Sequence, residues 1–87
     1  MAKVLNLPEA DRKLTGYFAG ALLLALRETE NQPQKRKELL TERLAQYFER
    51  LGPQALPIMM FAHWLDFTTT VIECLPEAER KAVWNAL

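Results

Sequence analysis

The stretch YFAGALLLAL, Tyr17 to Leu26, decides the fold because it is the most apolar segment of the chain. It is too short to cross a bilayer, which takes about 20 consecutive apolar residues. Charged residues flank it at positions 11–13 on one side and at positions 27, 28 and 30 on the other. It also begins late for a signal peptide and lacks the small-residue cleavage site that such peptides carry. We therefore expect a buried helix in a soluble protein.

Leucines surround the axis of this helix, with alanines and glycines between them, so we expect it to be covered on nearly all sides. Gly16 and Gly20 lie four residues apart and leave a flat patch where another backbone could approach closely. That backbone could belong to the same chain or to a partner.

Prolines and one glycine divide the sequence into four expected helices, and no segment alternates with the period of a strand. Short links favour antiparallel neighbours. We expect an all-α, up-and-down bundle of three long helices plus a short C-terminal helix, with residues 1–87 forming a single domain. The expected helices run from Pro8 to about Glu30, from the connection at 29–34 to Leu51, from about Pro57 to Cys74 or Leu75, and from Pro76 to Leu87.

Composition narrows the choice of partners and compartment. The 87 residues carry 11 basic and 11 acidic side chains. A net charge near zero gives no long-range attraction for nucleic acid or for an anionic membrane. The single cysteine, Cys74, cannot form an internal disulfide, which favours the cytoplasm. We expect no cofactor.

The apolar stripes also predict an order of burial. The second helix has one narrow stripe that includes Leu40, so we expect it at the periphery. The first helix and the third, with Leu22 and Phe61, should be central. Truncating Leu40 should therefore cost less stability than truncating either of them.

The third helix carries the residues that most resemble an active site. On a helical wheel its apolar side chains cover about half the circumference, and a polar strip falls outside that arc. We expect this strip to face solvent. The alternative is a metal or catalytic site, because His63 and Asp66 have the i, i+3 spacing that lets two side chains reach one ion. The strip consists of His63, Asp66, Thr70 and Glu73.

Cys74 borders the apolar arc, so we expect a buried, inert thiol. His63 precedes it by eleven residues, which is about 16 Å along a helix. The two side chains cannot form a catalytic pair within one helix.

Lys35, Arg36 and Lys37 form the only basic cluster, at the start of the second helix, where cations oppose the helix dipole. Glu30, Glu38 or a partner could offset this cost. A helix-turn-helix interpretation fails, because the expected recognition helix is apolar where base edges need polar side chains.

These patterns favour a non-catalytic protein–protein interaction module: an adaptor, regulator, inhibitor or assembly factor, compact in the manner of bacterial or phage proteins. One alternative is a small nucleic-acid-associated regulator that uses the basic cluster. Another is a metal-binding or enzymatic protein that uses His63 and Asp66. We expect apolar surface to be left over and to form a homodimer or a tight hetero-complex. The candidate interface residues are Gly16, Gly20, Trp64, Val83, Trp84 and Leu87.

Overall fold

The computed structural model describes residues 4–51 and 61–87, without the side chains of 61–63. Within these ranges the chain is all-helical, as the sequence predicts. The helices are α1 (Glu9–Glu28), α2 (Pro33–Arg50), α3 (Phe61–Ile72) and α4 (Glu77–Ala86). The described part of α3 has 12 residues and α4 has 10, so the expected pattern of three long helices and one short one is not confirmed.

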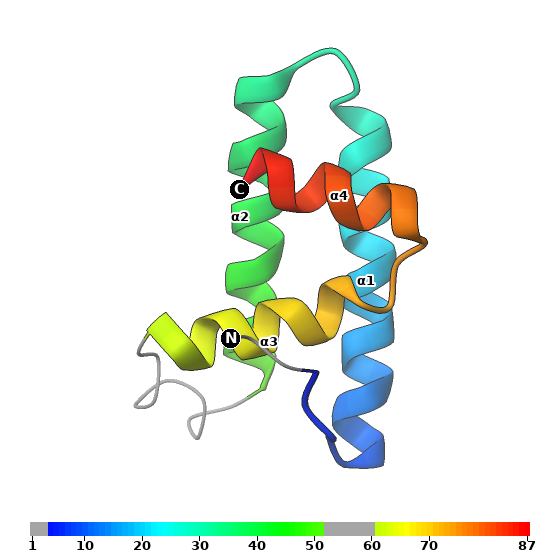
Figure 1. Cartoon of the computed structure of the whole chain (residues 1–87), viewed down its shortest axis with the longest axis vertical. Helices are drawn as coiled ribbons and strands as arrows, with labels where there is room; N and C mark the ends of the chain where they lie inside the picture. Colours follow the sequence, from blue (N-terminus) through cyan, green and yellow to red (C-terminus); the bar gives the residue numbers. More distant parts are fainter. Residues whose placement is uncertain (1–3, 52–60) are drawn as a thin grey trace.

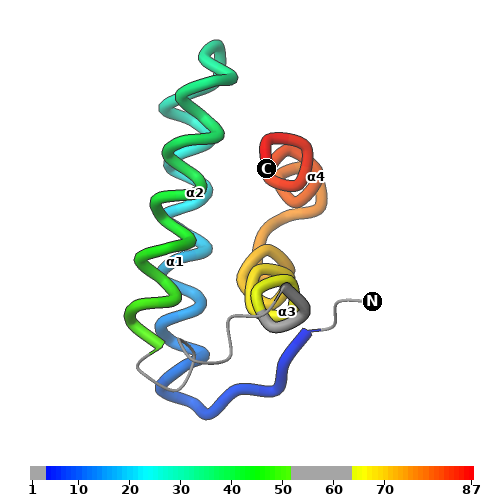
Figure 2. The backbone as a smooth tube through the Cα atoms, turned by 90° about the vertical axis from the view of Figure 1, so that its left-hand side faces the viewer, coloured from blue at the N-terminus to red at the C-terminus, as the bar shows by residue number. Residues whose placement is uncertain are grey.

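The helices form two layers. α1 and α2 lie side by side as an antiparallel pair, and α3 and α4 cross this pair on one of its faces (Figures 1 and 2). The antiparallel arrangement that short links favour is therefore seen in α1 and α2. No helix of the described ranges is long and apolar enough to cross a membrane.

Helix boundaries follow the prolines. Pro8 and Pro76 directly precede α1 and α4, whose first turns carry acidic residues that suit the positive end of the helix dipole. Pro33 is the first residue of α2, where its missing N–H has no cost. The expected Gly52–Pro53 stop and the expected start at Pro57 lie outside the described residues. α3 ends two residues before Cys74, since residues 73 and 74 form a turn.

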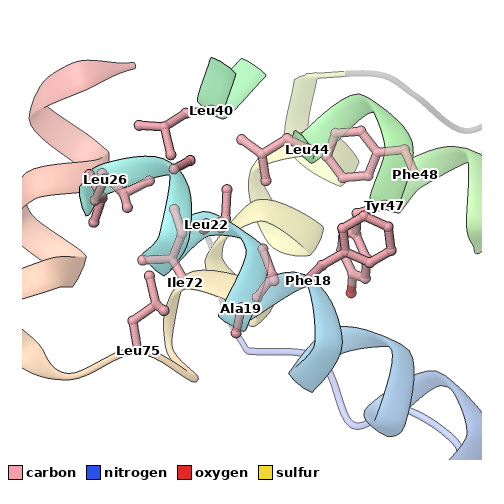
Figure 3. Packing of buried hydrophobic residues seen from close by; sticks show 13 residues of the cluster. Phe18, Ala19, Leu22, Leu26, Leu40, Leu44, Tyr47, Phe48, Ile72 and Leu75 are labelled. Atoms are coloured by element: carbon pink, nitrogen blue, oxygen red, sulfur yellow. The ribbon is translucent and has the colours of Figure 1, made fainter. Parts of the chain in front are cut away.

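The core lies between the two layers. In α1, buried side chains recur at three- and four-residue intervals, which turns one face of the helix inward. α2 supplies four buried side chains, α3 and the turn after it supply three, and α4 supplies one (Figure 3). The core residues are Phe18, Ala19, Leu22, Ala25, Leu26, Leu40, Leu44, Tyr47, Phe48, Val71, Ile72, Leu75 and Val83.

The expected order of burial is wrong for α2. Leu40 has no exposed surface, and neither does Leu22. The stripe of α2 is narrow, but it packs along α1 and under the second layer, so its side chains are fully enclosed. Conversely, α1 is not covered on all sides, because Tyr17 and Leu24 are 71% and 58% exposed. The expected order of burial also included Phe61, whose side chain lies outside the described residues.

Leu22→Ala and Leu40→Ala should each lower the free energy of unfolding by about 2–5 kcal/mol, because each leaves a cavity between the layers. Leu24→Ala removes the same atoms from an exposed site and is the matched control, with an expected effect within about 0.5 kcal/mol. Denaturant titration of the three variants measures these differences. A loss at Leu24 equal to that at Leu22 would show that the outer side of α1 is covered.

Candidate interaction surface

The polar strip expected on the third helix is not a solvent-facing strip. Thr70 is buried, and its Oγ1 accepts a hydrogen bond of 2.8 Å from the Leu5 amide. The Thr70 hydroxyl donates to the Asp66 carbonyl oxygen at 2.8 Å. The segment before α1 runs back beside α3 (Figure 2), and this contact excludes water from Thr70. The sequence could not reveal this contact, because the two residues are 65 positions apart.

The other members of the strip have separate surroundings. Asp66 is half-buried, and Glu73 lies in the turn after α3, where it forms an ion pair of 3.3 Å with Arg80 of α4. The Arg80 Nε also donates to the Leu75 carbonyl oxygen at 2.7 Å, so Arg80 braces the α3–α4 corner. The side chain of His63 lies outside the described residues. Among the described residues, no three His, Cys, Asp or Glu side chains gather to hold a metal ion.

The expectation of a buried Cys74 thiol is wrong, since Cys74 is exposed. It follows the end of α3 and lies in the turn, where the helix no longer directs it inward. Its Sγ donates to the Thr70 carbonyl oxygen at 3.6 Å.

Arg36 of the basic cluster connects the two long helices. Its Nη2 donates to the Leu26 carbonyl oxygen at 2.7 Å, and its Nε donates to Thr29 Oγ1 at 3.4 Å. The cation therefore lies at the C-terminal end of α1, where the helix dipole is negative. This contact offsets its unfavourable place at the start of α2. Lys35 and Lys37 are exposed.

A buried polar pair joins α1 to α2. The hydroxyls of Thr15 and Tyr47 are 2.9 Å apart, and Thr15 Oγ1 also donates to the Asp11 carbonyl oxygen at 2.7 Å. Because the Thr15 proton is used in that bond, Tyr47 is the donor to Thr15. Burial raises the pKa of the Tyr47 phenol above its usual value. This pair is structural, since both side chains are enclosed.

The expected interface residues fall into three groups. Val83 has no exposed surface and packs in the core, which removes it from the candidate set. Trp64, Trp84 and Leu87 are half-buried against that core. Gly16 and Gly20 are exposed on α1, and a Cβ added at either would meet no other atom within 4 Å.

An open groove lies between α1 and α2. It holds about 800 Å³. Tyr17, Ala21 and Leu24 of α1 line one wall, and polar side chains of α2 line the other. The lining residues from α2 are Arg43, Gln46, Glu49 and Arg50.

The sequence interpretation missed Tyr17 and Leu24 as surface residues. Their signal was available: with Gly20 they recur at intervals of three and four, so they share a face of the helix opposite the buried residues. The alanines and leucines between them obscured this second face, since the whole segment is apolar. We define the outer surface of α1 as Lys13, Tyr17, Gly20, Leu24 and Glu28.

No protein-family model, curated protein or solved structure matches the chain.

Tyr47→Phe should change how stability depends on pH. Burial raises the folded-state pKa, so the unfolded chain loses its phenol proton first as the pH rises above about 10. Tyr47 therefore contributes stability below pH 10 that is lost as the pH rises through its folded pKa. Tyr47→Phe should cost about 1 kcal/mol at neutral pH and lessen the alkaline fall. Denaturant titrations of the wild type and of Tyr47→Phe from pH 7 to about 11 test this. An equal fall in the free energy of unfolding of both proteins would contradict it.

Thr70→Val should release the segment before α1 from α3. The Leu5 amide would lose its acceptor, at a cost of about 0.5–1.5 kcal/mol, and should exchange its hydrogen faster with solvent. Thr41→Val is the matched control, because the Thr41 hydroxyl is exposed and donates to the Lys37 carbonyl oxygen of its own helix. Hydrogen-exchange NMR compares the two variants, and only Thr70→Val should speed exchange at the Leu5 amide. Unchanged exchange at Leu5 would mean that this bond does not hold the segment.

Proposed function

We propose that the protein is a non-catalytic protein–protein interaction module, an adaptor, regulator, inhibitor or assembly factor, which acts through the outer surface of α1. The observation that carries this proposal is the exposure of two large apolar side chains on one stripe, Tyr17 at 71% and Leu24 at 58%. Exposed apolar surface that is grouped, rather than scattered, is typical of binding sites.

The surroundings of these two side chains support the proposal. They line a groove with an apolar wall from α1 and a polar wall from α2. Interfaces commonly combine an apolar centre with a polar rim, and tyrosine is among the residues enriched in them. The single free cysteine favours a cytoplasmic location for the module.

The alternative of a nucleic-acid-associated regulator has less support. Arg36 contacts the Leu26 carbonyl oxygen within the protein, which leaves the exposed cations of the cluster as Lys35 and Lys37. Two lysines could contact few phosphates of a nucleic-acid backbone, and the net charge of the chain is zero. We therefore place the binding surface on α1.

Affinity capture with matched baits tests this proposal. Leu24→Glu puts a charge at an apolar residue of the outer surface, whereas Val4→Glu puts the same charge at an apolar residue of similar exposure, 57%, outside this surface. The specific partner should bind the wild type and Val4→Glu but not Leu24→Glu. Binding should persist at about 1 M salt, since an apolar contact resists screening. A partner held equally by all three baits, or released by salt, would place the binding surface elsewhere.

A further inference from the structure

The outer surface of α1 has an order of charges that depends on direction. Lys13 lies toward the N-terminal end, Glu28 is the last residue of the helix, and Tyr17, Gly20 and Leu24 lie between them. All five are exposed. Lys13 and Glu28 are 15 residues apart, which corresponds to about 22 Å along the helix. The stripe is therefore apolar at its centre, positive at one end and negative at the other.

This order is symmetric about a single point. Tyr17 and Leu24 are equally distant from the midpoint between Gly20 and Ala21, and so are Lys13 and Glu28. A twofold axis through that midpoint, perpendicular to α1, would place Tyr17 of one copy on Leu24 of the other. It would also place Lys13 opposite Glu28 at both ends. An interface between two identical copies must be complementary to itself in this way.

We propose that the partner of the outer surface is a second copy of this chain, with the two α1 helices antiparallel. This inference rests on the proposed function and specifies its partner. A parallel pair would instead place Lys13 opposite Lys13 and Glu28 opposite Glu28, and like charges across an interface are unfavourable. The charges on the stripe therefore select both the occupant and its direction.

The space on this face admits the second helix. Helical spacing puts this face opposite the buried residues of α1, and α3 and α4 lie together on one side of the α1–α2 layer (Figure 2). The groove beside the stripe holds about 800 Å³, and Tyr17 and Leu24 line it. Nothing lies within 4 Å of a Cβ added at Gly20, so a second backbone can approach at the axis. The apolar side chains of each copy would enter the groove of the other.

The first test measures self-association. Sedimentation or light scattering from about 1 μM to 1 mM should show a monomer–dimer equilibrium for the wild type. Leu24→Glu should weaken it by at least about tenfold, because the substitution buries two charges in the interface, each opposite Tyr17 of the other copy. Val4→Glu is the matched control and should associate like the wild type. Circular dichroism checks that both variants remain helical.

The second test uses charge exchange. Lys13→Glu and Glu28→Lys should each weaken dimerisation by about three- to tenfold, since each converts two attractive pairs into repulsive ones. The double variant exchanges the charges and should recover wild-type association. Lys37→Glu alters the net charge as Lys13→Glu does, but Lys37 is an exposed residue of α2 outside the stripe, so this substitution should have no effect. In a parallel dimer, neither single exchange would weaken association.

The outcomes separate this inference from the proposed function. A wild type that stays monomeric up to about 1 mM overturns self-pairing. If Leu24→Glu then still releases a different captured protein, the interaction surface stands with another partner. If the wild type dimerises and Leu24→Glu and the charge exchanges leave that dimer unchanged, the antiparallel α1 pair is wrong.

Discussion

The structure depends on one constraint, the coverage of α1. This helix is apolar around most of its circumference, but the other described helices lie where they cover only part of it. Its inner face packs against α2 and the second layer, and that packing encloses Leu22 completely. Its outer face keeps Tyr17 and Leu24 in contact with solvent. The core and the proposed binding surface are thus two sides of one helix.

Polar side chains fix the connections around that core. Arg36 links the start of α2 to the end of α1, and Arg80 links α4 to the turn after α3. Thr70 holds the segment before α1 against α3. Each bond satisfies a backbone group near a chain turn, where helical hydrogen bonds are missing. The apolar core supplies most of the stability, and these contacts determine how the elements are joined.

The sequence predicted the local features better than the assembly. Helix type and most boundaries follow from prolines and from three- and four-residue spacing, which act within a few residues. The second layer depends on contacts between distant positions. Thr70 illustrates this, because its spacing placed it on a polar strip, whereas a bond to the Leu5 amide buries it. The narrow apolar stripe of α2 predicted partial burial for Leu40, but Leu40 is fully buried because α1 and the second layer cover it. The apolar surplus on α1 was predictable from composition. The spacing of Tyr17, Gly20 and Leu24 also indicates the face that carries it, but the alanines and leucines between them obscured this pattern.

The outer faces of α1 and α2 differ although both helices lie in the same layer. α2 presents glutamates at positions 38, 42 and 49 to solvent, whereas α1 presents Tyr17 and Leu24. Folding does not require this difference, because neither α1 side chain belongs to the core. Polar residues at both positions would keep the inner face intact and lower the tendency to aggregate. Single exposed apolar residues are common and need no explanation. Here two share one stripe, with opposite charges at its ends, so the pattern fits binding better than it fits the stability of the fold.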